Sequence, residues 1–503
     1  MIRLNRSRKA VLFLLIFVSV IVFCGLVYAA SLWDTRKSNV QNTAKPQEEA
    51  ETLADNEPAL EQDQDMDMAD IYESDIEATD LTDPAYITIP EQYGTIIETH
   101  KGTNGKTIIH IQDAHMNYEG QKNEAMLIES LLEDYGLNLI LLEGKVTDFN
   151  FNYIRERASV EERAQKADEL LKDGVINGVN YVNIATDYPM NIQGIEDKKI
   201  YDDNRDGLWE IDKFKGLAAE YVDKMTAASD AIKSGIYNNA LLDLDTKKKE
   251  YDAEKIDLLG YYEYLYGKAE ETSIPLYTFP NFQSLINANN LEKKIDLAKI
   301  RDGSASDEEM DTYSEYLEAT RELNINELFK EEPLLEDVVQ NALATTYDQK
   351  KLLKISKALS VMGNLLKIKV VPEEYNYFME NKKDFDAQFW SDFLEQKSRE
   401  LGISADIPSN YYVVNDNLAK VANFYSIAAE RDKVFLEKTN EHIQKAGAET
   451  AILVAGGFHT PTLTDLLADA GYSYIVISPK VTTETNDELY RSALKKDWMP
   501  GVE

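Results

Sequence analysis

The sequence has little cysteine, histidine or positive charge. Its 503 residues include one cysteine, Cys24, and five histidines. One cysteine alone cannot form an internal disulfide or a zinc site built from several thiolates. Ninety acidic against 53 basic residues give a formal net charge of −37, and such a surface repels the phosphates of nucleic acids. We therefore expect no nucleic-acid partner.

A long apolar run stands at the N-terminus. It extends from Ala10 to about Ala30 and follows four basic residues at positions 3, 6, 8 and 9. This order is typical of an export signal, and Val27 and Ala29 suit a signal-peptidase site. The run is also long enough to span a bilayer, so both a cleaved signal peptide and a signal anchor stay open for residues 1–31. In either case we expect an extracytoplasmic protein, periplasmic, secreted or anchored to the membrane by this run.

Residues 32–84 contain few apolar side chains, and these show no periodicity. Positions 34–83 hold 16 acidic and three basic residues, a net charge of −13. Such a segment repels itself and has too little apolar surface to form a core. We expect an acidic, disordered linker that separates the N-terminal segment from a domain over residues 85–503.

Short apolar runs that end at polar or glycine-rich junctions recur in this domain. They include "KTIIHIQDAH", "YGLNLILLEG", "YPMNIQGIED", "ETAILVAGG" and "YSYIVISP". Helical patterns alternate with the first of these runs, which predicts an α/β core with a mostly parallel sheet flanked by helices. Asn104-Gly105, between two strand-like runs, predicts a β-hairpin. From about 201 to 446 the apolar residues recur every three or four positions, which predicts a large all-helical insertion before the last strands.

In open α/β sheets, ligands bind at the carboxyl ends of the strands. The residues predicted at those ends are Gln112, Asp113, His115, Glu143, Glu196, Asp197, Gly456, Gly457 and His459. Imidazole and carboxylate without thiolate suit manganese, cobalt, zinc or iron. Taken singly, each of these residues also suits a helix cap or a tight turn, but two scarce histidines at two strand ends favour one shared site. His110 has the opposite side-chain parity to Asp113 and His115, so we expect it to be packed in the core or behind the site.

The same segments resemble the superfamily that joins the erythromycin esterases, the haem-binding ChaN proteins, and the TraB and Tiki proteins. "QDAH" is similar to the first motif of that superfamily, Gly-Glu-x-His or Gly-x-x-His, with Gln112 in place of the glycine. "LLEG" and "GIED" are similar to its acidic segments, and "GGFH" fits its closing Gly-x-x-His. Arg431 and Asp432 resemble the Arg-Asn or Arg-Asp pair on the preceding helix. The resemblance covers roughly residues 90–200 and 415–480.

Members of this superfamily share an acid- and histidine-lined pocket but differ in chemistry: some are metal-dependent peptidases, some bind haem, and some open a lactone. The pocket residues and the resemblance together favour a metal-dependent hydrolase of peptide or other acyl bonds, acting on a peptide or small-molecule substrate. The metal ligands would be His115, His459 and Glu143, with manganese, cobalt or zinc as the ion. The other expected site residues are Glu143 or Glu196 as proton acceptor, Asp113 and Arg431 lining the pocket, and Gly456 and Gly457 beside the cofactor. The alternative is a haem- or iron-binding protein of the ChaN type without catalytic activity.

A further motif stays ambiguous. "DDNRDGLWEIDK" has Asp202, Asn204, Asp206 and Gly207 at the spacing of a calcium-binding loop, but Lys213 stands at the twelfth position, where a bidentate glutamate is needed. The segment predicts either a calcium loop or the polar start of a helix.

Overall fold

The computed structural model describes residues 81–115 and 117–483. The predicted export or anchor segment, and residues 32–80 of the predicted linker, lie outside these residues. Within them, no helix is both long and apolar enough to cross a membrane. The chain is already packed against the core at Leu81, whose carbonyl oxygen accepts a hydrogen bond from the hydroxyl of Thr450.

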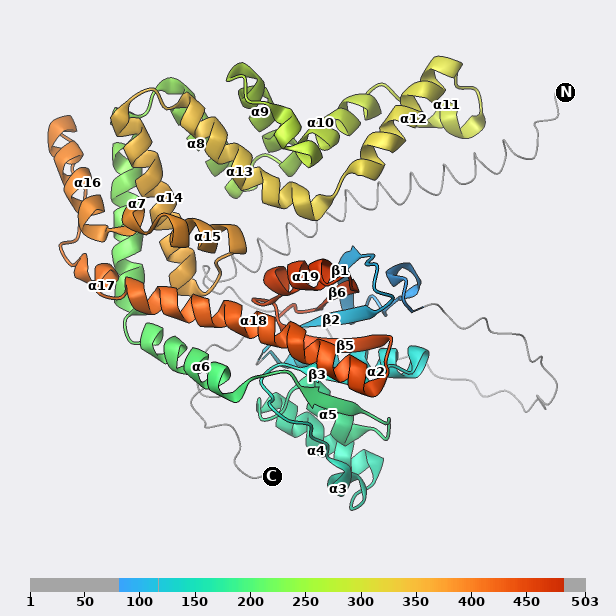
Figure 1. Cartoon of the computed structure of the whole chain (residues 1–503). Helices are drawn as coiled ribbons and strands as arrows, with labels where there is room; N and C mark the ends of the chain where they lie inside the picture. Colours follow the sequence, from blue (N-terminus) through green and yellow to red (C-terminus); the bar gives the residue numbers. More distant parts are fainter. Residues whose placement is uncertain (1–80, 116, 484–503) are drawn as a thin grey trace, which may run out of the picture.

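One six-stranded sheet forms the centre of the α/β core (Figure 1). The strands are β1 (Gly94–His100), β2 (Thr107–Asp113), β3 (Leu139–Leu142), β4 (Asn191–Gly194), β5 (Thr450–Gly456) and β6 (Ser473–Pro479). Their order is β1-β6-β2-β5-β3-β4, and only β1 runs antiparallel to its neighbour. The predicted fold class, a mostly parallel α/β sheet, is therefore confirmed, and each predicted strand is present.

The predicted hairpin between β1 and β2 is wrong, because β6 lies between these two strands and pairs with both. The connection, residues 101–106, crosses the beginning of β6. The amides of Thr103 and Asn104 both donate to the carbonyl oxygen of Gly471, at 2.8 and 2.9 Å. Neighbouring strands are only about 4.8 Å apart, so a connection of this length can pass one strand. The turn at Gly105, with φ of 72°, was predicted correctly, but the pairing around it was not.

Helices cover both faces of the sheet, as a parallel sheet with continuous apolar strands requires. One face packs against α2 (Tyr118–Tyr135), α4 (Val160–Lys172) and α5 (Gly178–Ala185), with the short α3 (Asn152–Arg155) beside them. The other face packs against α18 (Leu418–Ala446) and α19 (Thr460–Asp469). Side chains alternate between the faces, so that Ile109 and Ile111 of β2 meet the first group while Ile108 meets the second.

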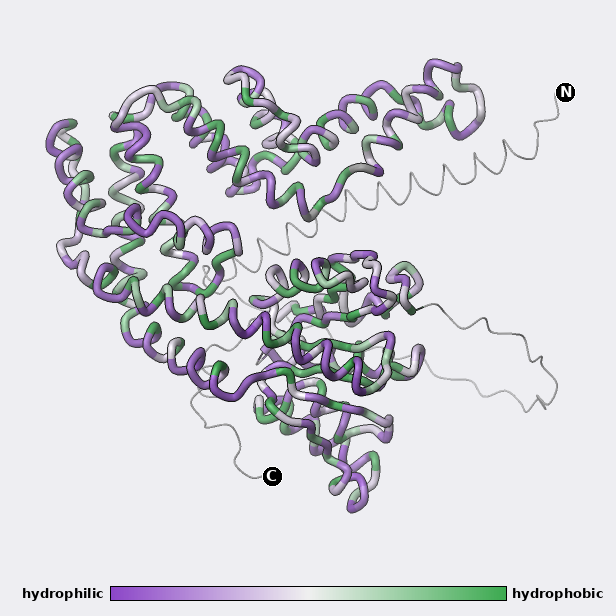
Figure 2. The backbone as a smooth tube through the Cα atoms, in the orientation of Figure 1, coloured by the Kyte–Doolittle hydropathy of each residue, from purple (hydrophilic) through white to green (hydrophobic). Residues whose placement is uncertain are grey.

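Every described element between β4 and β5 is a helix. Besides α18, the α-helices there are α6 (Lys198–Asp212), α7 (Lys215–Ile236), α8 (Asn239–Asp252), α9 (Leu258–Glu271), α10 (Pro280–Glu292), α11 (Leu297–Asp302), α12 (Asp307–Glu322), α13 (Ile325–Leu343), α14 (Tyr347–Lys367), α15 (Pro372–Glu380), α16 (Ala387–Leu401) and α17 (Tyr412–Asn415). Three 3₁₀ turns complete the described elements: η1 (Pro84–Tyr86), η2 (Leu276–Thr278) and η3 (Lys382–Phe385). Figure 2 shows green and purple alternating along these helices, as expected of amphipathic helices that bury one side.

Helix α18 belongs to both parts of the molecule. Near its start, Phe424 and Tyr425 lie in the apolar core of the helical region. Near its end, Phe435 and Ile443 lie in the core against the sheet. Arg431 and Asp432 therefore lie where the helical region meets the sheet, and Figure 1 shows α18 crossing from one to the other.

Candidate active site

The end of β2 places an aspartate behind an accessible histidine. Nδ1 of His115 lies 2.8 Å from Oδ2 of Asp113, and Oδ1 of the same aspartate accepts a hydrogen bond from Gln121 on α2. The side chain of His115 is 41% exposed, whereas that of Asp113 is 5% exposed. Asp113 therefore fixes the orientation of the imidazole that solvent reaches.

The end of β5 repeats this arrangement. Nδ1 of His459 lies 2.5 Å from Oδ1 of Asp432 on α18, and both side chains are 4% exposed. The backbone amide of His459 donates to the carbonyl oxygen of Gly456, which closes a tight turn before α19. Hydrogen bonding of one ring nitrogen to a carboxylate sets the direction of the other.

Glu143, at the end of β3, lies between the two histidines. Its Oε1 is 3.3 Å from Nε2 of His459, and its Oε2 accepts a hydrogen bond of 2.6 Å from the amide of Gly456. A Cβ atom at Gly456 would lie 3.3 Å from Nε2 of His115 and 3.5 Å from Oε2 of Glu143. Nε2 of His459 therefore faces Glu143, and Nε2 of His115 lies beside the same carboxylate at Gly456, where the missing side chain leaves room for both.

Arg431 is buried among the acidic residues of this edge. Its Nη2 donates to Glu143 Oε1 at 2.9 Å and to Glu196, and its Nε donates to the other oxygen of Glu196 at 3.2 Å. Its Nη1 donates to Asn204 on α6 at 2.9 Å and lies 3.4 Å from His459. These contacts engage every nitrogen of a guanidinium that is 8% exposed. Arg431 therefore holds the carboxylates in place and has little surface to offer a ligand.

The charges of the cluster shift its pKa values strongly. Partial burial of the His115 ring opposes its protonation, but Asp113 outweighs this effect and raises the pKa of His115 to about 9. Burial likewise opposes protonation of His459, and Glu143 and Asp432 together raise its pKa to about 9. Burial would raise the pKa of Glu143, yet His459 and Arg431 hold it well below its usual range. Burial raises the pKa of Glu196 against the effect of Arg431.

The cluster has an excess of negative charge. Its carboxylates are Asp113, Glu143, Glu196 and Asp432, and its one guanidinium is that of Arg431. Four negative charges against one positive charge leave −3 when both imidazoles are neutral. Two imidazolium protons would reduce this excess to −1, and so would one divalent cation.

A divalent cation fits these donors in kind and in charge, but not in their present spacing. As arranged here, no three His, Cys, Asp or Glu side chains of residues 81–115 and 117–483 are spaced to hold one metal ion. Arg431 lies against Oε1 of Glu143 and so restricts that side of the carboxylate. The donor chemistry nevertheless matches that of metal ligands, because each imidazole has its Nδ1 against a carboxylate, and Nε2 of His459 faces Glu143.

No protein-family model, no curated protein and no solved structure matches the chain.

The structure brings together most of the residues predicted at the strand ends. Asp113, His115, Glu143, Glu196, Arg431, Gly456 and His459 all belong to the cluster described above. Gly457 is exposed beside Gln112, and Gln112 donates to Thr460 rather than to the cluster. Asp197 caps α6 through the amide of Ile200 and lies outside the cluster.

Sequence reasoning missed Asn204 and Gln121, and it noted Asp432 without its partner. Asn204 stood within the calcium-like motif, but that segment is helix α6, so the calcium loop is wrong. Nothing in its spacing indicated a contact with Arg431. Gln121 lies in the first turns of the helix after β2, and polar residues at such a position are one signal for a site at strand ends.

The three remaining histidines have structural contacts. His110 is fully buried, as its parity predicted, with Nδ1 3.3 Å from the carbonyl oxygen of Leu453 and Nε2 2.9 Å from the hydroxyl of Thr460. His100 stacks on Tyr474. His442 lies 3.2 Å from the carbonyl oxygen of Gly194 at the end of β4.

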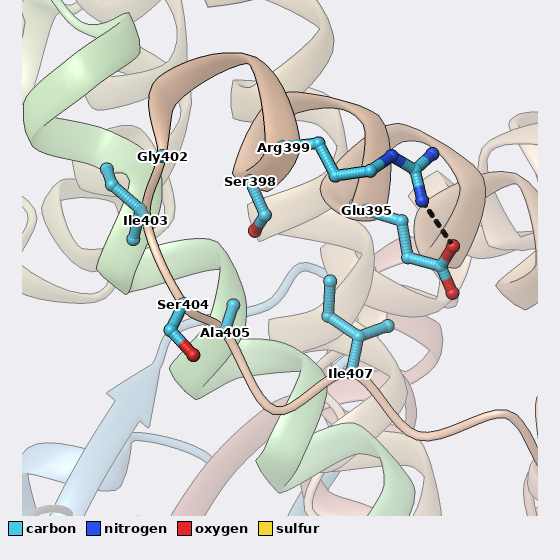
Figure 3. A pocket seen from close by; sticks show the side chains of 8 residues that line it. All are labelled: Glu395, Ser398, Arg399, Gly402, Ile403, Ser404, Ala405 and Ile407. Atoms are coloured by element: carbon cyan, nitrogen blue, oxygen red, sulfur yellow. Dashed lines mark hydrogen bonds and ion pairs between the residues drawn. The ribbon is translucent and has the colours of Figure 1, made fainter.

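A surface hollow in the helical region contains none of these residues. It lies between the end of α16 and the segment that follows, and Figure 3 shows its lining side chains. Its charged residues, Arg399 and Glu395, are paired with each other at 3.3 Å. No histidine lines the hollow.

Proposed function

We propose that the protein is a hydrolase of acyl bonds, in peptides or small esters, with a divalent cation held by His115, Glu143 and His459. The observation that supports this proposal is that two aspartate-backed imidazoles lie beside the same glutamate at the carboxyl edge of the sheet. With both imidazoles neutral, as metal ligation requires, the formal excess of negative charge in the cluster supports a cation there. The motif resemblance points to the same residues.

When bound, the ion would lower the pKa of a coordinated water and polarise the substrate carbonyl. The chain itself would supply orientation and a proton acceptor. Asp113 and Asp432 each hold one imidazole by its Nδ1. Proton acceptance falls to Glu143 or Glu196, the two carboxylates that Arg431 holds in the cluster.

Arg431 was expected to line the pocket and to steady a carboxylate or the developing oxyanion. Its nitrogens are bound to side chains of the cluster, so we assign it to holding Glu143 and Glu196 rather than to contacting the substrate. His115 is the accessible member of the cluster, and we therefore place the substrate on its side of Glu143.

The test uses the full-length chain, treated with EDTA and then supplied with manganese, cobalt or zinc. Hydrolysis of p-nitrophenyl acetate and of a fluorogenic peptide library is measured for wild type, His115→Ala and His459→Ala, with His100→Ala as the matched control. We expect one metal to restore hydrolysis, and either site variant to reduce it at least about 100-fold, the scale of a lost acid–base or metal-activating group.

The other outcomes separate the parts of the proposal. Hydrolysis that requires His115 but is not inhibited by EDTA would refute the metal and keep the hydrolase part of the proposal. Equal hydrolysis by wild type and His115→Ala would refute the proposed active site. A Soret shift with one hemin per chain, without hydrolysis of either probe, would favour the haem-binding alternative.

A further inference from the structure

A second carboxyl group is buried directly behind the site. Glu124 on α2 has no exposed surface, and neither of its carboxyl oxygens makes a well-formed hydrogen bond among the described residues, although Asp113, Gln121 and the amide of Val179 lie close to it. An ionised carboxylate without a partner is strongly disfavoured in the protein interior. Glu124 is not one of the residues used in the proposed function, so its presence needs a separate explanation.

The surroundings of Glu124 connect it to Asp113. Gln121, one helical turn earlier, donates from Nε2 to Asp113 and accepts at Oε1 from the amide of Gly178 at 2.7 Å. A Cβ atom at Gly178 would lie 2.7 Å from Oε1 of Glu124, so this oxygen is packed against the start of α5. Glu124 and Gln121 therefore lie on the same face of α2, and this face is directed toward Asp113 at the end of β2.

The electrostatics agree with this geometry. Burial raises the pKa of Glu124 well above its usual range, and the charge of Asp113 raises it further. Two adjacent buried carboxyl groups do not both ionise readily, and a shared proton relieves the repulsion. Asp113 accepts a hydrogen bond from Gln121 and lies against His115, so its carboxyl oxygens are placed to accept a further hydrogen bond from Glu124.

We propose that Glu124 is a neutral carboxylic acid that donates its proton to Asp113 and thereby acts as a positioning residue for His115. The hydrogen-bond order is Glu124 O–H to Asp113, and His115 Nδ1–H to Asp113. No proton is transferred between these residues, and no other reactant is needed. The neutrality of Glu124 does not depend on the proposed hydrolase activity. The expected effect of Glu124 on turnover does rest on that activity.

The first test is infrared spectroscopy of the full-length chain at pH 7. We expect the difference spectrum between wild type and Glu124→Gln to contain the carbonyl band of a protonated carboxylic acid. A difference spectrum that contains only carboxylate bands would overturn the proposal and would instead indicate a cation between Glu124 and Asp113. This measurement needs no substrate, so it is independent of whether the protein hydrolyses anything.

The second test compares Glu124→Gln with Glu124→Leu. The glutamine amide can still donate to Asp113, so we expect hydrolysis of p-nitrophenyl acetate within threefold of wild type. The leucine cannot donate, and we expect kcat to fall at least tenfold at unchanged KM. Leucine removes this one hydrogen bond but buries no new charge, so a lower Tm is expected while the variant still folds. Equal turnover by both variants would refute a positioning role.

A third measurement applies if neither probe is hydrolysed. The proton on Nδ1 of His115 should give a downfield resonance while it is bonded to Asp113. We expect this resonance to persist in Glu124→Gln and to be lost by exchange in Glu124→Leu. Its persistence in both variants would show that Asp113 holds the imidazole without help from Glu124.

Discussion

Acidification should loosen the sheet at His110, and the structure sets the size of the effect. The ring is fully buried in β2, where the carbonyl of Leu453 can only accept from Nδ1–H and the hydroxyl of Thr460 can donate to Nε2. The neutral ring satisfies both contacts. Burial lowers the pKa of His110 from 6.5 to about 4.

The direction of the pH effect follows because the pKa of His110 is lower in the folded protein than in the unfolded chain. Below pH 6.5 the unfolded chain binds a proton at His110 that the folded protein does not bind until about pH 4. Stability is therefore complete above pH 6.5 and is lost progressively as the pH falls to about 4. At 1.36 kcal/mol per pH unit, the loss over this window is about 3 kcal/mol.

Native-state hydrogen exchange of the β2 and β5 amides measures this loss without requiring the whole chain to unfold in one step. The free energy of opening in His110→Gln, relative to wild type, should rise by about 3 kcal/mol between pH 7 and pH 4. Thr460→Val keeps the titrating ring and should retain the wild-type pH dependence at lower stability. A wild-type–His110→Gln difference that is constant with pH would refute the reasoning.

Three further outcomes follow from the same contacts. Arg431→Met should lower stability by about 3–5 kcal/mol because it leaves buried carboxylates unpaired, and adding Glu196→Met should restore part of it, as thermal unfolding would show. Gly456→Ala places a methyl group 3.3 Å from an imidazole nitrogen. The affinity of the proposed site for metal, measured by calorimetry, should therefore fall about 10- to 100-fold. Gly457→Ala, the control, should not change this affinity. Gly102→Ala would place Cβ 2.2 Å from backbone atoms and should lower Tm by an amount equivalent to at least about 1–3 kcal/mol.

Local patterns located the strands and helices because side-chain periodicity is a local property. The order of the strands was not accessible in the same way: residues 101–106 have the composition of a hairpin turn, yet β6 arrives from the other end of the chain and takes the position beside β2. What decides the pairing is the apolar surface that β6 buries on both sides, and no window around Asn104 contains that information.

The site shows the same division. The strand-end rule located His115, Glu143 and His459 because strand ends are visible in the sequence. The contacts of Asn204 and Asp432 depend on how α6 and α18 lie against the sheet. These placements are set by packing between the helical region and the core, where Phe424 and Phe435 belong to different apolar clusters.

The position of β2 between β5 and β6 also has a consequence for biosynthesis. Both neighbours of β2 come from the last part of the chain, and His110 meets Leu453 across 343 residues. A growing chain therefore holds an apolar strand with both edges unpaired while the entire helical region is being made. Such an edge can pair with other chains, and closing so long a loop slows folding. We expect nascent chains that end before β5 to need a chaperone. We also expect the imidazoles of His115 and His459 to be brought to the same site only in the completed protein.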